Sequence, residues 1–188
     1  MKQAKVLSEA ELKRVLSVVA NQRHAARNRV ALMLSFYAGM RVGEIAYLKV
    51  GDVIDGDGRV KDQIVLPASY TKTAEARTVF VNGKLRRELE RFLSCNTTTD
   101  RAVPFLVTQK ATAFSANTLC QLFGQIYELA GIDGASSHSG RRWFITQMAH
   151  KGVSAKVIMT LAGHRHLSTT QRYIEVNDQM MKAAVEGL

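Results

Sequence analysis

Residues 30–48 read VALMLSFYAGMRVGEIAYL, an apolar run that stops at a glycine and gives way to a segment with two charged residues. The apolar spacing, continued toward the N-terminus, predicts a helix over residues 25–37. Gly39 lies where the C-terminus of a helix often needs a left-handed residue. Arg41 is therefore expected just beyond a helix end, ahead of a short helix over residues 42–48.

Further elements are expected on both sides of this stretch. Ser8 and Glu11 have the spacing of a capping box, which predicts an amphipathic helix from about Glu9. Residues 61–66 and 78–81 carry β-branched side chains and predict two strands joined by an exposed basic loop. Other helices are expected over residues 84–93, 117–130, 143–150 and 154–161, with a turn at 170–174 and a tail helix from 178. The sequence therefore predicts a mostly α fold with one small antiparallel β-sheet (α+β).

Length and charge narrow the class of protein. The chain has 188 residues, which corresponds to one compact domain. Its 26 Lys and Arg residues against 16 Asp and Glu residues give a net charge of +10, which favours a polyanionic partner such as nucleic acid or an anionic membrane surface. The apolar stretch over residues 30–40 is shorter than the roughly 20 residues of a transmembrane helix, and the N-terminus lacks a secretory signal. We therefore expect a cytoplasmic protein, and the charge alone does not choose between the two kinds of partner.

Several common sites are excluded by their missing motifs. The chain contains no GxxxxGK[ST], GxGxxG, HExxH or GxSxG, so the sequence gives no ground for nucleotide hydrolysis, zinc proteolysis or α/β-hydrolase chemistry. His164 and His166 have no Cys or carboxylate at metal-ligand spacing, so no metal is expected there. Asp52, Asp55 and Asp57 have the wrong spacing for a calcium loop and predict a turn.

Cationic and imidazole side chains remain, spread over three segments around one tyrosine. Arg41 lies at the glycine-punctuated helix junction, and Glu44 follows at a spacing that lets its carboxylate hold the guanidinium. Further along, His138 and Arg141 are three residues apart at the start of a helix, where both can address one oxyanion. The third segment, residues 161–176, has a histidine after a glycine at a helix end and a tyrosine nine residues later.

Taken together, these segments resemble the tyrosine recombinase (phage integrase) family, and the resemblance extends over residues 7–177. The family's A-G-x-R-x-x-E box matches residues 38–44, and its H-x-x-R box matches residues 138–141. The G-H-x-x-x-x-T-T-x-x-Y box matches residues 163–173, and the family's hairpin lysine matches Lys72 in TKTAEART. Within the family, the chain is similar to stand-alone fimbrial-invertase-like or Xer-type recombinases.

The resemblance implies a site-specific recombinase that cleaves and rejoins double-stranded DNA through a covalent 3′-phosphotyrosyl intermediate, without metal, ATP or another cofactor. It also implies a homotetramer on DNA, no membrane partner and a connection with mobile genetic elements. In this interpretation Tyr173 is the nucleophile, His138 is its base and Lys72 is the acid for the leaving 5′ oxygen. Arg41 and Arg141 clamp the phosphate, and His164 donates a hydrogen bond to it. Glu44 orients the site. Arg142, Arg165 and Arg172 are candidate DNA contacts, with plain surface as the alternative.

The chain departs from the family's usual layout in two ways. Residues 1–177 are interpreted as the catalytic domain, and residues 178–188 as a tail helix that either covers the surface or docks onto a neighbouring protomer. No N-terminal core-binding domain precedes them, which indicates a stand-alone recombinase or a fragment of a longer integrase. Gly140 also replaces the apolar residue that usually precedes the second arginine, which puts the local packing in question.

Two other classes of protein are considered. A type IB topoisomerase-like enzyme uses the same residue types for the same phosphotyrosyl step, but the chain length and the box over residues 163–173 favour a recombinase. A non-enzymatic regulator with a helix-turn-helix over residues 143–161, with Gly152 between the helices, leaves the arginine, histidine and tyrosine pattern unexplained.

Overall fold

The computed structural model describes residues 3–71, 74–96, 98, 100–174, 181–182 and 185–186. Its elements are α1 (Glu9–Ala20), α2 (Ala25–Ala38), α3 (Val42–Tyr47), α4 (Val50–Val53), β1 (Gln63–Leu66), η1 (Ala68–Tyr70), β2 (Arg77–Phe80), α5 (Gly83–Ser94), α6 (Ala116–Leu129), α7 (Ser139–His150), α8 (Ala155–Ala162) and α9 (Leu167–Gln171). The α+β prediction is confirmed. Within the described ranges, no helix is long and apolar enough to cross a membrane.

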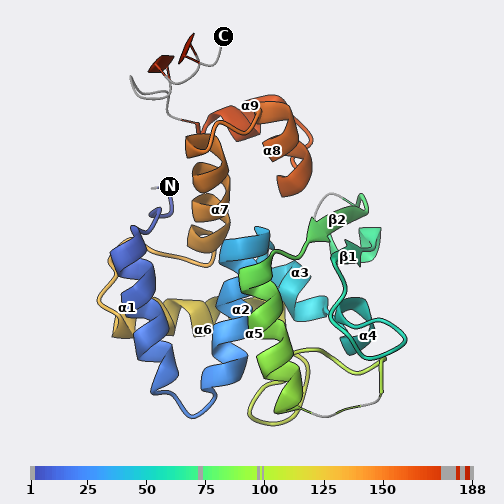
Figure 1. Ribbon diagram of the computed structural model, residues 1–188. Coiled ribbons are helices and arrows are strands. Elements are labelled where there is room, and N and C mark those ends of the chain that lie inside the picture. The colour runs from blue at the N-terminus through green and yellow to red at the C-terminus, as the bar shows by residue number, and fades with distance from the viewer. Residues whose placement is uncertain are drawn as a thin grey trace.

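Helix α2 is the centre of the fold (Figure 1). Its side chains at Ala31, Leu32, Leu34 and Phe36 have no exposed surface. Residues 30–36 of α2 are buried on all sides and almost wholly apolar, and such a helical segment is stable only when other elements surround it. Figure 1 shows α1 and α5 on either side of α2 and α7 continuing above it, and α2 makes its most extensive contacts with α5 and α7.

The predicted caps fix the ends of the first helices. Ser8 Oγ accepts from the backbone N–H of Glu11 at 3.2 Å, and the Glu11 carboxylate accepts from the backbone N–H of Ser8 at 2.9 Å, which confirms the capping box. Gly39 ends α2 with φ of 60°, in the predicted left-handed conformation. A Cβ atom added there would lie 2.4 Å from the Phe144 ring, so α7 leaves no room for another residue. Arg41 then directly precedes α3.

The packing around Gly140 explains why a glycine precedes the second arginine, Arg141. It lies in the first turn of α7, where a Cβ atom would be 2.4 Å from Ser35 Oγ and 2.9 Å from the Phe36 ring. The glycine therefore lets α7 approach α2 closely, and the apolar side chain typical of the family has no space here.

The two predicted strands form one antiparallel pair, with Ile64 opposite Val79 and Leu66 opposite Arg77. Ile64, Leu66 and Val79 are buried. Strand β2 begins one residue earlier than predicted, and this places Arg77 within the sheet.

Other predicted boundaries also shift. A short helix, α4, forms in the segment predicted as turns, because the Asp52 carboxylate accepts from the backbone N–H of Lys49 at 2.8 Å and caps it. Helix α7 begins at Ser139, as expected from His138 and Arg141 at a helix start, and so extends the helix predicted over residues 143–150. Helix α9 occupies part of the predicted turn. Of the predicted tail helix, only residues 181–182 and 185–186 are described, and the rest lies outside the described residues.

Candidate active site

The C-terminal end of α8 is the point on which the site converges. The last carbonyl groups of a helix lack partners within that helix. Here the carbonyl oxygens of residues 161–163 each accept a hydrogen bond from a different arginine. Arg77 donates to the first at 2.9 Å, Arg141 donates to the second, and Arg41 donates to the third at 3.2 Å. Three guanidiniums therefore surround one helix end, where the helix dipole also favours positive charge.

Glu44 holds two of these arginines, and its side chain is only 1% exposed. Arg41 donates to it from the backbone N–H and from the guanidinium, both at 2.8 Å, as the spacing of three residues predicted. Arg77 donates from Nε at 3.2 Å and from Nη2 at 2.6 Å, which makes a two-pronged contact with the carboxylate. Each carboxylate oxygen thus accepts from both arginines.

The charges of this group keep Glu44 ionised. Burial alone raises the pKa of its carboxyl, but the hydrogen bond and charge of Arg77, followed by those of Arg41, outweigh burial and hold the pKa below its usual value. With Arg141 as the third guanidinium, three positive charges face one negative charge. The group therefore carries a net positive charge suited to an anion.

Arg141 is buried, with 6% of its surface exposed. Its Nη1 donates to the carbonyl oxygen of Gly39 at 2.7 Å, so it joins the ends of α2 and α8. Burial, and then the charges of Arg41 and Arg77, lower its pKa to about 9. The guanidinium therefore remains charged at neutral pH.

His164 is placed by the way α8 ends. Gly163 is left-handed, with φ of 62°, and the backbone N–H of His164 donates back to the carbonyl oxygen of Met159 at 3.0 Å. Its Nδ1 lies 2.9 Å from the hydroxyl of Thr170, which is fully buried. Burial, and then the neighbouring guanidiniums, lower the pKa of His164 to about 4, so the imidazole is neutral at pH 7.

Tyr173 lies against His164, with ring centroids 5.9 Å apart and ring planes 21° from parallel. The guanidinium of Arg142 covers the tyrosine ring at 5.0 Å and also donates to the side chain of Gln3 at 2.7 Å. The predicted nucleophile is therefore half-buried beside the arginine group of its own chain.

The other predicted residues lie around this group. His138 is exposed and immediately precedes α7, one turn before Arg141. Arg165 pairs with Glu75 at 3.2 Å, which links the segment after α8 to the hairpin, and Arg172 is exposed. Lys72 lies outside the described residues.

Arg77 contacts both Glu44 and the end of α8, and it was not predicted as a site residue from the sequence. Strand alternation carried a signal, because residues two apart in a strand face the same side and Val79 is a core residue. An arginine on the buried face of a strand needs a partner.

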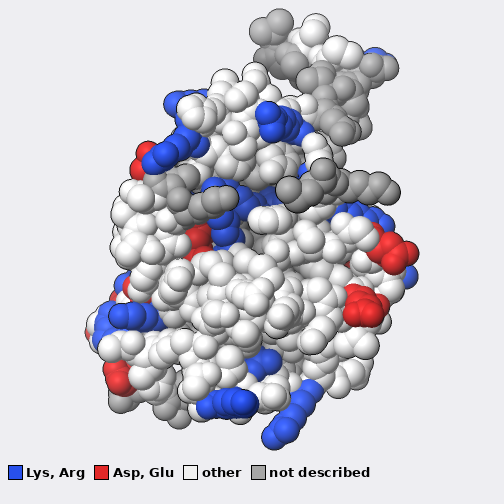
Figure 2. Space-filling model, turned by 180° about the vertical axis from the view of Figure 1, so that it is seen from behind, with Lys and Arg blue, Asp and Glu red and all other residues white. Residues whose placement is uncertain are grey.

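One face of the molecule is hollowed. Figure 2 shows Lys and Arg side chains gathered with acidic ones in a hollow on the face opposite to the view of Figure 1. Among the residues that the structure describes, no group of three or more His, Cys, Asp or Glu side chains is placed to hold a metal ion.

The structure is a mostly helical domain in which arginines, a histidine and a tyrosine gather at the end of one helix. Fold and site together define the class of protein. The model of the phage integrase family matches residues 5–180, so the chain belongs to that family. This confirms the predicted family and fold.

The chain is similar to several recombinases. It is 31% identical to tyrosine recombinase XerA of Pyrococcus horikoshii over 186 residues, which cover 97% of this chain and 60% of that protein. It is 24% identical to Transposase A from transposon Tn554 of Staphylococcus aureus, over 96% of this chain and 51% of that protein. The chain thus spans about three fifths or less of the length of these relatives.

Solved structures share the fold. The crystal structure of XerA recombinase aligns with a TM-score of 0.76 at 23% identity, covering 100% of this chain and 64% of that one. The Tn1549 transposon integrase in complex with a circular intermediate DNA aligns with a TM-score of 0.80 at 18% identity, covering 100% of this chain and 67% of that one.

Proposed function

We propose that this chain acts as the catalytic domain of a site-specific DNA recombinase, which cleaves and rejoins double-stranded DNA through a covalent bond to Tyr173. The observation that carries the proposal is the convergence of Arg41, Arg77 and Arg141 on the end of α8, with Tyr173 stacked on His164 beside them. Two structural relatives support it, because the Tn1549 integrase and XerH were solved as complexes with DNA.

The arginines suit the charge that develops during the reaction. Attack on a phosphodiester increases negative charge on the non-bridging oxygens, which planar guanidiniums bind well. Each guanidinium has five N–H donors. The side-chain contacts described for Arg41 and for Arg141 use two donors each, which leaves others for a phosphate.

The remaining residues move the protons. The hydroxyl oxygen of Tyr173 attacks phosphorus, and His138 accepts its proton, because a phenol with a pKa of about 10 is a weak nucleophile at neutral pH. The bond from phosphorus to the 5′ oxygen breaks, and Lys72 donates a proton to that oxygen. Neutral His164 donates from Nε2 to a phosphate oxygen when the Thr170 hydroxyl donates to Nδ1. The phosphotyrosyl bond conserves the energy for rejoining to another 5′ end.

A suicide substrate tests this proposal. A nick close to the cleavage site releases a short fragment and traps the covalent complex, which a denaturing gel resolves. We expect an adduct, and recombinant products when two target sites are supplied. Relaxation of supercoiled DNA without recombinants would favour a topoisomerase-like enzyme, and binding without an adduct would favour a regulator.

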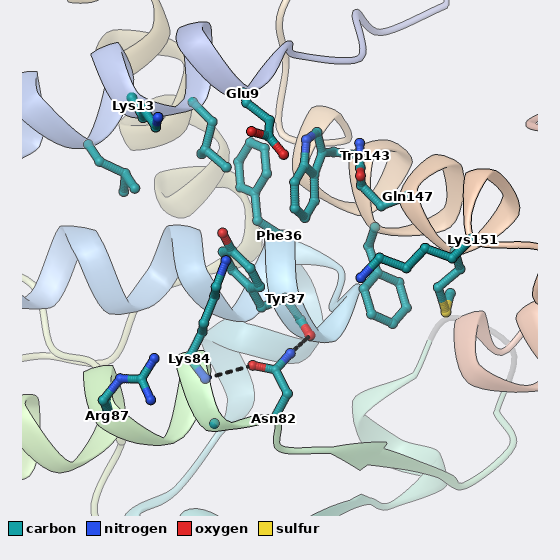
Figure 3. Close-up of a pocket in the computed structure, with 15 residues that line it drawn as sticks. Glu9, Lys13, Phe36, Tyr37, Asn82, Lys84, Arg87, Trp143, Gln147 and Lys151 are labelled. Atoms are coloured by element: carbon teal, nitrogen blue, oxygen red, sulfur yellow. Dashed lines mark hydrogen bonds between the residues drawn. The ribbon is translucent and has the colours of Figure 1, made fainter.

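We further propose that copies of the chain assemble on DNA by exchanging residues 178–188. The acceptor is a groove of about 690 Å³ between α1, α2, α5 and α7, shown in Figure 3. Tyr37 and Trp143 form an aromatic wall of this groove, and the side chains of Lys13, Lys84 and Lys151 surround it.

The tail matches the groove in chemistry. Residues 178–188 read DQMMKAAVEGL, in which apolar side chains recur at helical spacing between acidic ones. Met181 is 51% exposed and Val185 is 69% exposed, so neither apolar side chain is covered by its own chain. Exchange between copies buries them against the aromatic wall and places Glu186 among the lysines.

Trp143 reports on this exchange, because it is the chain's single tryptophan and it lines the groove. A peptide of residues 178–188, added to a chain ending at residue 177, is expected to change the fluorescence saturably. The same peptide with Met181→Asp and Val185→Asp is the control and is expected to have no effect. No change with the native peptide would refute the docking. A full-length chain that keeps the docked spectrum on dilution to a monomer would show that the tail binds its own groove.

A further inference from the structure

Arg77 has no role in the chemistry described above, yet it is as enclosed as a core residue. Its side chain is 7% exposed. Burying a guanidinium is costly unless the charge is paired and its donors are bonded. Arg77 meets this requirement through Glu44 and through the carbonyl oxygen of Leu161.

The first consequence concerns charge. Without Arg77, the pair of Arg41 and Glu44 would be neutral, and the carboxylate would compete with a DNA phosphate for the Arg41 guanidinium. Arg77 contacts both oxygens of Glu44, at 3.2 Å and 2.6 Å, and so supplies a second positive charge. Arg41 then has surplus charge for the phosphate.

The second consequence concerns position. A Cβ atom added to Gly163 would lie 2.6 Å from Cδ of Arg77, so the arginine stem lies directly on the glycine that ends α8. The Arg77 guanidinium also holds the carbonyl oxygen of Leu161 at 2.9 Å. Because His164 follows Gly163, the same side chain braces the segment that carries the imidazole.

We infer that Arg77 is a positioning residue of the proposed active site: it offsets the charge of Glu44, which leaves Arg41 available to the DNA phosphate, and it fixes the end of α8 next to His164. This inference rests on the proposed recombinase function. Arg77 itself has no assigned contact with DNA.

The test compares three variants with the wild-type chain on the suicide substrate, at saturating enzyme. Arg77→Met removes the charge and both contacts. Glu44→Gln combined with Arg77→Met removes the buried carboxylate as well, so no carboxylate remains to compete with the phosphate for Arg41. Arg29→Met is the matched control, because Arg29 makes a similar two-pronged contact with Glu88, at 2.7 Å for each bond, on α2 and α5.

We expect Arg77→Met to slow single-turnover cleavage by about 10- to 100-fold, the size of effect that a small misplacement of reacting groups produces. DNA affinity is expected to change by less than about threefold, because a few phosphate contacts among many are affected. The double variant is expected to recover part of the lost rate. Arg29→Met is expected to lower thermal stability and leave the cleavage rate unchanged.

Three results would overturn the inference. They are a wild-type rate in folded Arg77→Met, an equal loss of rate in Arg29→Met, and a double variant no faster than the single one. A wild-type chain that forms no adduct would instead contradict the proposed function. In that case the role of Arg77 is decided by the binding of orthovanadate, measured as the shift that it causes in the thermal midpoint. A shift in the wild type that persists in Arg77→Met would refute the inference.

Discussion

His164 and Tyr173 stack on one another within a single chain, with ring centroids 5.9 Å apart. Tyr173 follows His164 by nine positions in sequence, and α9 lies between them. The short helix turns the chain back on itself, because Thr170 is buried and contacts His164 Nδ1. The tyrosine is therefore delivered to the arginine group of the chain to which it belongs.

The environment of His164 predicts a pH dependence of stability. Burial and the neighbouring arginines lower its pKa from 6.5 to about 4 in the folded state. The unfolded chain therefore binds a proton below about pH 6.5 that the folded chain does not bind until about pH 4. The free energy of unfolding therefore falls as the pH drops from about 6.5 to about 4. Above that window, His164 is neutral in both states and makes no pH-dependent contribution. Thermal midpoints at pH 7 and pH 5 are expected to differ less for His164→Gln than for the wild type, and an equal difference would contradict the prediction.

The close packing at Gly140 predicts that a larger residue there destabilises the protein. In Gly140→Ala the new Cβ atom meets Ser35 Oγ at 2.4 Å, so we expect a loss of about 1–3 kcal/mol in the free energy of unfolding. Gly124→Ala is the control, because Gly124 lies inside α6 and a Cβ atom added there would meet no atom of another element within 4 Å. There an alanine is expected to add about 0.5–1 kcal/mol through helix propensity. Denaturant unfolding measures both variants, and equal effects would contradict the packing argument.

The proposed role of Lys72 as the general acid can be tested by chemical rescue. If Lys72 protonates the leaving 5′ oxygen, Lys72→Ala is expected to slow cleavage of ordinary DNA by about 100- to 10,000-fold. A substrate with sulfur at the 5′ bridging position needs no acid, so this variant is expected to cleave it nearly as fast as the wild type does. Arg41→Ala and Arg141→Ala are expected to stay slow, because they act on non-bridging oxygens. Rescue of Lys61→Ala or Lys84→Ala instead of Lys72→Ala would assign the acid elsewhere.

Arg172 predicts a change in salt dependence. It is exposed at the end of α9, beside the proposed nucleophile. If it contacts a phosphate, Arg172→Gln is expected to reduce the slope of log affinity against log salt by about 1. Arg23→Gln is the control, since Arg23 is exposed between α1 and α2, at the end of the molecule away from α9 in Figure 1. Equal slopes for the wild type and Arg172→Gln would place Arg172 outside the DNA contact.

Local spacing explains why part of the site was predictable from the sequence. Arg41 and Glu44 are three residues apart at a helix start, and the geometry of one helical turn brings them together. Gly39 was predictable for the same reason, since a left-handed helix end is a local feature.

Long-range packing explains what the sequence did not predict. The contacts of Arg77 join residues 33 and 84 positions apart, and no local spacing encodes them. The role of Gly140 depends likewise on how closely α7 approaches α2. The boundaries of α4 and α9 were missed because single side chains, Asp52 and Thr170, stabilise helices too short to show a periodic pattern.

The central claim is that Tyr173 forms the covalent bond to DNA, and peptide mapping of the trapped complex tests it most directly. Trypsin cleaves after Arg172, so the labelled peptide is expected to begin at Tyr173 and to carry the residual nucleotide on that residue. Tyr127 is the contrasting candidate, because it is 1% exposed and burial raises the pKa of its hydroxyl. We predict the nucleotide mass on Tyr173 in the wild type and no labelled peptide in Tyr173→Phe. A nucleotide on Tyr127 or on any other residue would contradict the account.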